Sequence, residues 1–475
     1  MLALLLTLSL AFAAPDTSAP AAAPPVQDTW DLTALYPSLD AWTAAMDQTR
    51  QQVDALVDCR DQLDERLEPC LVARDQAHQA VAKLHVYASN HSNVDTRDDA
   101  WLARAQQAEQ LYIRLDEVAS FYEPELLSLG SERIEAALSA SLGLAPFDHQ
   151  LRSLLRRAPH VLDPAQEELL AAAGTLMAAP PRLHTVFVNG ELPWPQVTLS
   201  DGSGGRLDPA HFAAWRGTAH RGDRQVLFST FLGALQGYTG TLAGLLDTAI
   251  QGHWLAARTR GYDSSLEAAL APEGLPTAVY ETLVARTRAN LPTLHRYLRL
   301  RARMLGVDDL AYSDLYTPLV HLDRTWTLDQ AKALSLSSSK PLGRDYVATM
   351  AQGFDQRWMD AWPGPGKVGG AYMDGAAYDV HPFVLMNFTG EYDSVSTLAH
   401  EWGHALHSVL SARAQPFAKA DYSTFVAEIA STFNEDLLLA TMLDGAKTDD
   451  ERLFYLGSRL ESLRTTCWCL SLIHI

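Results

Sequence analysis

The sequence predicts a mainly α-helical protein with two or three helical lobes and a small β element. The chain has 475 residues, which is too long for one simple core. Residues 38–175 carry apolar side chains at three- and four-residue steps, as in "DDAWLARAQQAEQLYIRLDEVASFY", and this period is that of amphipathic helices. The same period returns from His211 to about Leu305.

One stretch between these helical regions breaks the period. Residues 187–208 read "FVNGELPWPQVTLSDGSGGRLD", in which Asn189-Gly190 and Asp201-Gly202 are turn dipeptides beside short β-like runs. We therefore expect a small hairpin and a domain seam here. The seam would separate an N-terminal helical domain, 29–186, from a second domain, 209–469.

The charge of the chain excludes one large class of function. A formal net charge of -20 and a pI near 5.1 are the opposite of the clustered positive charge that nucleic-acid binding requires. The same acidity disfavours attachment to an anionic membrane.

The N-terminus is typical of an exported protein. Leu2 to Phe12 form an apolar run too short to span a bilayer, and Ala11-Phe12-Ala13 fits a signal-peptidase site. We expect residues 1–13 to be a signal peptide and the Ala/Pro-rich residues 14–28 a flexible linker. The mature protein would then be periplasmic or secreted in a bacterium, without stable membrane insertion. If the run is instead an Ala-rich tail, the protein is cytoplasmic.

Two of the four cysteines lie close together in a predicted helical hairpin. Cys59 and Cys70, in "DCRDQLDERLEPC", can pair in an oxidising compartment. Two free thiols are an equally open alternative, because spacing alone does not fix the geometry that a disulfide needs.

The stretch "TLAHEWGHALHS", residues 397–408, has the residue types and spacing of a zinc-binding motif. On a helix His400 and His404 lie one turn apart on the same face and can bind one metal ion, while Glu401 lies beside the open position as a general base. Asp393 or Ser394 is the expected N-cap of this helix. A chance match to this short motif remains an alternative.

A catalytic zinc site needs a third protein ligand. The metzincin pattern is excluded, because His407 and Leu410 stand where it requires glycine and histidine. Glu428 lies in a second helical pattern among apolar residues, where a carboxylate is costly unless it is bound. We predict Glu428 as the third ligand. Glu435, two turns later, is expected to hold a ligating histidine in orientation.

Some of these residues also fit an ordinary structural role. Two carboxylates on one helix face, such as Glu428 and Glu435, are often a solvated edge. Both His407 and Asp393 are candidates for orienting the metal ligands, although for His407 a packed helix histidine is the simpler reading.

Segments along the whole chain resemble the oligoendopeptidase F group of the thimet-oligopeptidase-like zinc peptidases. The similarity lies in "LMNFTGEYDSVSTLAHEWGHALHSVL" and "DYSTFVAEIASTFNE", and also in "WDLTALYPS", "KLHVYASNHSNVDTRDDAW" and "NLPTLHRYLRLRARMLGVDDLAYSDLYTPL". These segments occur in the family's order, and the similarity runs from about Trp30 to Thr466.

The resemblance implies two helical lobes around a deep channel with one zinc ion per chain on its floor. It implies zinc ligation by His400, His404 and Glu428, and a channel that admits short peptides but excludes folded proteins. It further implies that "GGAY" and the predicted strand "PFVLMNF", residues 382–388, line the cleft and pair with an extended substrate. The cleft candidates are Gly370, Tyr372 and Asn387.

The last residues depart from the family pattern. "LSLIHI", residues 470–475, carries no similarity and matches the translation of a transposase adaptor used for sequencing libraries, so we expect adaptor read-through. The C-terminal part with the family's Tyr and His oxyanion donors would then be missing. The alternative to an active peptidase is therefore a catalytically impaired zinc-binding fragment, or a peptide-binding protein.

Overall fold

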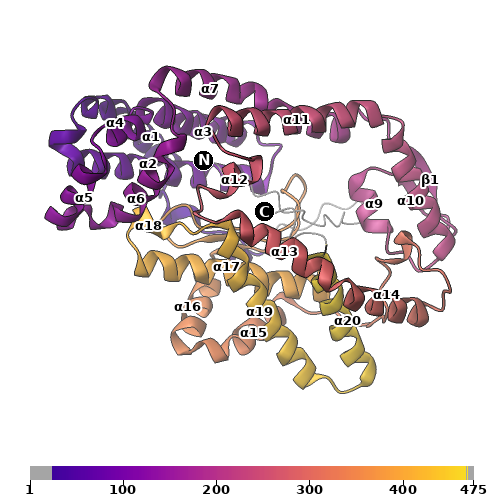
Figure 1. Ribbon diagram of the computed structural model, residues 1–475. Helices are drawn as coiled ribbons and strands as arrows, with labels where there is room; N and C mark the ends of the chain where they lie inside the picture. Colours follow the sequence, from indigo (N-terminus) through magenta and orange to yellow (C-terminus); the bar gives the residue numbers. More distant parts are fainter. Residues whose placement is uncertain (1–23, 467, 469–475) are drawn as a thin grey trace. The chain divides into compact units, whose positions relative to one another are not determined.

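The computed structural model describes residues 24–466 and 468, and it is mainly helical, as the sequence predicts (Figure 1). The expected signal peptide, 1–13, and residues 470–475 lie outside the described residues. The described residues divide into two compact units, each made of two separate stretches of sequence. The domain limits 29–186 and 209–469 come from sequence pattern and stay a prediction.

The larger unit combines residues 24–158 with 324–445. Its N-terminal helices are α1 (Leu39–Ala55), α2 (Leu63–Val94), α3 (Asp99–Ala119), α4 (Tyr122–Ser128), α5 (Ser131–Ala140) and α6 (Asp148–Arg157). Its later elements are α15 (Leu328–Ser338), α16 (Arg344–Asp355), β3 (Met359–Asp360), β4 (Tyr372–Asp374), β5 (Phe383–Leu385), α17 (Tyr392–Ala414), α18 (Phe417–Ala420) and α19 (Thr424–Gly445).

The smaller unit combines residues 159–323 with 446–466 and 468. Its elements are α7 (Pro164–Met177), α8 (Ala179–Val186), β1 (Gln196–Thr198), β2 (Gly204–Arg206), α9 (Pro209–Trp215), α10 (Arg221–Gln236), α11 (Thr239–Thr259), α12 (Ser265–Leu270), α13 (Thr277–Ala289), α14 (Leu291–Leu305) and α20 (Asp449–Thr465).

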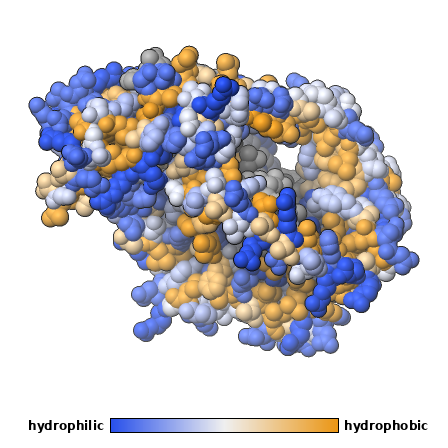
Figure 2. Space-filling model, viewed as in Figure 1, coloured by the Kyte–Doolittle hydropathy of each residue, from blue (hydrophilic) through white to orange (hydrophobic). Residues whose placement is uncertain are grey.

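Helix α1 illustrates how the sequence pattern becomes structure. Ser38 caps its first turn by accepting a hydrogen bond from the backbone N–H of Ala41. Its buried residues recur every three to four positions and face α2: Trp42, Met46, Thr49 and Val53. Hydrophilic side chains predominate over the N-terminal helices, with apolar ones between them, at the upper left of Figure 2.

The end of the expected linker is ordered rather than flexible. Val26–Asp28 forms a short 3-10 turn, and the buried Asp28 carboxylate accepts hydrogen bonds from Trp362 Nε1 at 3.0 Å and Lys332 Nζ at 3.2 Å. Proline and alanine content signals flexibility, but one buried ion pair is enough to fix a short segment to the core.

A three-stranded sheet links the N-terminal helices to α17. Its order is β3-β5-β4, with β5 parallel to β3 and antiparallel to β4. Phe383 and Leu385 of β5 belong to the same buried cluster as Trp42 and Leu84, while β4 and β5 also contact α17. The small strand element expected near the site is therefore present.

The hairpin expected at 187–208 forms only in its second half. β1 and β2 pair antiparallel around a turn in which Gly202 has a φ of +84°, so Asp201-Gly202 acts as the turn dipeptide. Asn189-Gly190 does not form a turn between strands, because Phe187–Glu191 continues the preceding helix as one π-helical turn. Val197, Leu199 and Leu207 bury the hairpin against Leu227 of α10.

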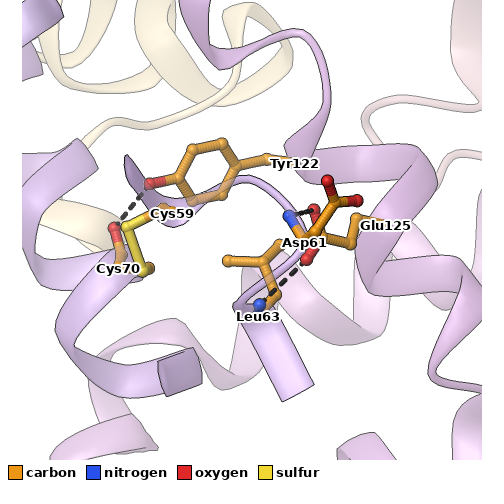
Figure 3. Close-up of a disulfide and its surroundings, with 6 residues drawn as sticks. All are labelled: Cys59, Asp61, Leu63, Cys70, Tyr122 and Glu125. Carbon is orange, nitrogen blue, oxygen red and sulfur yellow. Dashed lines mark hydrogen bonds between the residues drawn. A yellow bond between two sulfur atoms is a disulfide. The ribbon is translucent and has the colours of Figure 1, made fainter. Parts of the chain in front are cut away.

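Cys59 and Cys70 are joined by a disulfide with a Cα–Cα distance of 5.8 Å (Figure 3). Both residues are buried: Cys59 ends the short 3-10 helix before α2, and Cys70 lies within α2. Glu125 of α4 caps this helix start by accepting hydrogen bonds from the backbone N–H groups of Asp61 at 2.9 Å and Leu63 at 2.8 Å. The Tyr122 hydroxyl donates to the Cys70 carbonyl at 3.0 Å, so α4 is tied to both sides of the disulfide.

Candidate metal centre

Helices α17 and α19 lie side by side and carry all the residues of the predicted zinc site (Figure 1). Helix α17 begins at Tyr392 with Glu391 as its N-cap, after a turn at Gly390, where φ is +82°. The predicted caps Asp393 and Ser394 are therefore wrong by two to three residues. The Ser394 hydroxyl instead donates to the Glu391 carbonyl inside the first turn.

The apolar side of α17 fixes the helix in the core. Trp402 is fully buried, with its ring 4.2 Å from that of Phe354. Gly353 makes room for it, because a Cβ at this position would lie 2.5 Å from Trp402 Cη2. Since Trp402 lies between the two motif histidines in sequence, its packing also fixes the rotation of the motif about the helix axis.

The other side of α17 touches the backbone of α19. A Cβ on Gly403 would lie 2.7 Å from Ser431 Cα and 2.8 Å from the Ala430 carbonyl oxygen, so only glycine permits this approach. Asn434 Nδ2 donates to the Ala399 carbonyl at 3.2 Å, which adds a polar tie between the helices. These two contacts set the separation across which the site forms.

The predicted ligands His400, His404 and Glu428 meet at one point. The two Nε2 atoms are 3.2 Å apart, and Glu428 Oε2 lies 3.3 Å from His400 Nε2 and 3.4 Å from His404 Nε2. Among the residues that the structure describes, this is the one group of three or more His, Cys, Asp or Glu side chains placed to hold a metal ion.

Two further side chains orient this group. Glu435 Oε1 lies 2.6 Å from His400 Nδ1, the contact expected of a carboxylate that orients a ligating histidine. The Ser431 hydroxyl donates to Glu428 Oε2 at 2.7 Å. Neither Ser431 nor Asn434 is a predicted site residue. The available signal for Ser431 is its position three residues after Glu428, on the same helix face.

The electrostatics of the site reflect this crowding. Burial disfavours the imidazolium of His400, but hydrogen bonds to Glu428 and Glu435 outweigh it and raise its pKa to about 10. Burial likewise opposes ionisation of Glu428, but its contacts with His400 and His404 lower the pKa of its carboxyl well below the usual range. The negative charge of the Glu428 carboxylate and the positive charge of the neighbouring imidazoles therefore stabilise each other.

Glu401 differs from the other carboxylates of the site. It is 6% exposed, and within the described residues no side-chain hydrogen bond reaches its carboxylate. Burial raises its pKa, the two histidines oppose this rise, and Glu428 and Glu435 add to it. A buried carboxylate whose pKa is raised is suited to accept a proton.

His407 and Asp393 lie outside the three-residue group. The His407 ring stacks on Tyr422 with centroids 3.8 Å apart, as expected of a packed helix histidine. Asp393 is in the first turn of α17, where burial, then Glu391 and Glu435, raise the pKa of its carboxyl. Asp393 is thus within electrostatic range of Glu435, but no hydrogen bond connects the two residues within the part of the chain that the structure describes.

The cleft candidates sit in and beside the sheet. The Tyr372 hydroxyl accepts a hydrogen bond from Asn93 Nδ2 at 2.7 Å, so its side chain faces α2 and leaves only its backbone for a ligand. Asn387 Nδ2 donates to the carbonyls of Val368 and Gly370, so it holds the preceding loop.

The expectation that an edge of the strand 382–388 pairs with a substrate is wrong for β5. This strand lies between β3 and β4, so both of its edges are already paired. Strand order depends on contacts distant in sequence, and composition does not reveal it. Within the described sheet, β3 and β4 are the two outer strands, and each is paired on one edge only.

The fold is shared with solved structures that are described as peptidases. The structure is similar to that of a peptidase from Chlamydophila abortus, with a TM-score of 0.81 and 32% identity over 94% of this chain and 76% of that one. It is also similar to oligoendopeptidase F from Enterococcus faecium, with a TM-score of 0.64 and 25% identity over 91% and 72% of the two chains. The fold and these similarities define the protein's class as a peptidase.

Sequence comparison identifies the family. An oligoendopeptidase F homolog of Lactococcus lactis is 34% identical over 92% of this chain and 73% of its own length. The model of peptidase family M3 matches residues 218–472, and that of oligopeptidase F matches residues 125–193. The chain belongs to peptidase family M3, and the resemblance seen in the sequence is confirmed.

A search for membrane-spanning helices gives a negative result for the described residues. None of their helices combines the length and apolarity needed to cross a bilayer.

Proposed function

We propose that the chain is a zinc-dependent endopeptidase that hydrolyses short oligopeptides. The zinc ligands are His400, His404 and Glu428, and Glu401 is the general base. The observation that carries this proposal is the mutual 3.2–3.4 Å spacing of the three ligand atoms.

That spacing fits zinc. Zinc–nitrogen and zinc–oxygen bonds are about 2.0–2.1 Å, and the edge of a tetrahedron is about 1.63 times its centre-to-vertex distance, which gives about 3.3 Å between ligand atoms. The spacing of the three atoms therefore matches that of three protein ligands of a tetrahedral zinc ion, and these three side chains would hold the ion if it were bound. Two nitrogens and one carboxylate oxygen are also a ligand set that zinc accepts. One such group supports one zinc ion per chain.

The surrounding residues prepare the ligands. Glu435 accepts the Nδ1 proton of His400, which leaves the Nε2 lone pair directed at the centre. The Ser431 hydroxyl fixes Glu428 Oε2, which is the oxygen that lies near both histidines. Glu428 and Glu435 increase the affinity of His400 for a proton. A metal ion that binds His400 must displace this proton, so metal uptake depends on pH.

Glu401 performs the proton transfer. Bound zinc supplies Lewis-acid chemistry, because it lowers the pKa of water and polarises a carbonyl. The Glu401 carboxylate takes the proton from the attacking water and then delivers it to the leaving amine. Burial raises the pKa of Glu401 and so favours uptake of this proton.

The substrate class rests on family membership and on the sheet. The relatives are named oligoendopeptidases, and the unpaired edge of β4 offers backbone groups to an extended peptide. Gly370 and Tyr372 contribute through their backbone, and Asn387 through the loop that it holds. The net charge of -20 argues against nucleic acid as a partner.

The conservative variant Glu401→Gln tests the mechanism. We expect it to keep one zinc ion and to lose cleavage of a short fluorogenic peptide, because the amide cannot accept the proton. Zinc content is measured by mass spectrometry on the same sample. Cleavage by Glu401→Gln at the wild-type rate would contradict the assigned base, and absence of zinc from the wild-type protein would contradict the metal site.

We also propose that the protein is exported to the periplasm or the medium. The buried Cys59–Cys70 disulfide supports this, because such bonds persist in oxidising compartments. Thiol labelling of the denatured protein, taken from a periplasmic fraction without reductant, should modify neither cysteine. Full labelling of both in freshly lysed cells, with the protein confined to the cytoplasm, would contradict export.

A further inference from the structure

An arginine without a counter-ion lies in the smaller unit, at the end of α9. Arg216 follows the last residue of this helix, and its Cζ lies 3.8 Å from the centre of the Tyr316 ring. The side chain is half-buried. Within the described residues, no carboxylate lies within ion-pairing distance of its guanidinium, and no side-chain hydrogen bond satisfies its donors.

The buried arginines around it are all paired. Arg224 binds Asp314 at 2.9 Å, and Arg301 binds Glu461 at 2.7 Å. Arg464 binds the same Glu461 at 2.9 Å. Arg216 is thus an exception in a region where partly or fully buried guanidinium groups otherwise have carboxylate partners.

The local field makes this exception costly. Burial lowers the pKa of Arg216, Tyr316 and Tyr312 oppose this shift, and the nearby charge of Arg464 adds a smaller lowering. Arg464 lies over the same Tyr316 ring, with its Cζ 5.6 Å from the ring centre. Partial desolvation of a cation beside another cation is unfavourable unless an anion compensates for it. The stacking on Tyr316 recovers only part of that cost.

The shape of this site suits a carboxylate. A guanidinium offers a planar pair of N–H donors that match the two oxygens of a carboxylate. The Tyr316 ring orients that plane, and the Tyr312 and Tyr316 hydroxyls lie 3.3 Å apart beside it. The chain's large negative charge disfavours a polyanionic ligand and is compatible with a single carboxylate.

We propose that Arg216, stacked on Tyr316, binds the terminal carboxylate of an oligopeptide. This inference rests on the proposed function, in which the substrates are oligopeptides. It adds that a peptide ligand needs an unmodified C-terminal carboxylate. A peptide with a terminal amide lacks the charge and one acceptor, so it binds more weakly.

Direct binding tests this proposal without requiring catalysis. Isothermal titration compares N-acetyl-trialanine with its C-terminal amide, using the full chain. We expect the acid to bind at least about tenfold more tightly than the amide, which is the smallest effect expected for a hydrogen bond to a charged group. The preference should disappear in Arg216→Gln and persist in part in Arg216→Lys, which keeps the charge. Arg258→Gln is the matched control, because Arg258 stacks on Trp254 but is exposed.

The outcomes separate this inference from the proposed function. Equal binding of acid and amide, no binding of the acid, or an undiminished preference in Arg216→Gln overturns the inference. Inorganic phosphate that binds as tightly as the peptide acid also overturns it, because the site is then a general anion site. Failure of the wild-type protein to cleave any peptide contradicts the proposed function, while the titration still decides the role of Arg216.

Discussion

Gly403 sets the distance between α17 and α19, and therefore the geometry of the candidate metal site. In Gly403→Ala the new Cβ would lie 2.7 Å from Ser431 Cα, whereas ordinary contacts begin at 3.4 Å. Because the atoms that the new Cβ meets are backbone atoms of α19, the helices must separate by the difference, 3.4 − 2.7, or about 0.7 Å. Side-chain rotation cannot relieve this contact.

The consequence for the metal site follows from the same displacement. The distances from Glu428 Oε2 to the two histidine nitrogens, now 3.3 and 3.4 Å, would widen to about 4 Å. Supporting contacts around zinc ligands are worth about 10- to 100-fold in metal affinity. We expect a loss of that size in Gly403→Ala, together with about 1–3 kcal/mol of destabilisation from overpacking.

The assay is zinc competition with a chromogenic chelator, with circular dichroism to verify the fold. Gly457→Ala is the matched control, because Gly457 lies inside α20 and a Cβ there meets nothing within 4 Å. It should keep wild-type zinc affinity. Wild-type zinc affinity in a folded Gly403→Ala protein would refute the argument that backbone contact fixes the site.

Two further predictions concern charge and pH. Glu435→Gln should lower zinc affinity about tenfold, because the amide is a weaker acceptor for the Nδ1 proton of His400; unchanged affinity in the same chelator competition would contradict this. Burial, helped by Arg104, lowers the pKa of His91, whose ring stacks on Trp101, to about 4. As the pH is lowered from 6.5 to 4, His91 is therefore protonated in the unfolded state before it is protonated in the folded state. The free energy of unfolding therefore decreases as the pH is lowered through this range. His91→Gln should flatten that slope in urea titrations; an equally steep slope would show that His91 is not responsible.

Local periodicity was sufficient to single out the three side chains that meet at the candidate metal site. The i, i+4 spacing of His400 and His404 fixes their common face in any helix, and Glu428 is recognisable as a carboxylate among apolar residues. Both arguments need only the helix in which each residue lies. The structure brings the two helices together at the distance that the prediction requires.

Features that depend on contacts between distant segments were not predictable in this way. The Cys59–Cys70 pairing stayed open, because spacing does not define the Cα–Cα distance. The central position of β5 and the inward direction of Tyr372 depend on strand order and on the packing of α2. The start of α17 depends on the positive φ of Gly390, which outweighs the capping propensity of the residues that follow.

The most direct test of the central claim is the zinc content of matched histidine variants. His404→Ala removes a predicted ligand, and His407→Ala removes a histidine of the same helix that stacks on Tyr422. We predict one zinc ion per chain in the wild-type protein and in His407→Ala, and a large loss of zinc in His404→Ala. Equimolar zinc in purified His404→Ala, or its loss only in His407→Ala, would contradict the site formed by His400, His404 and Glu428.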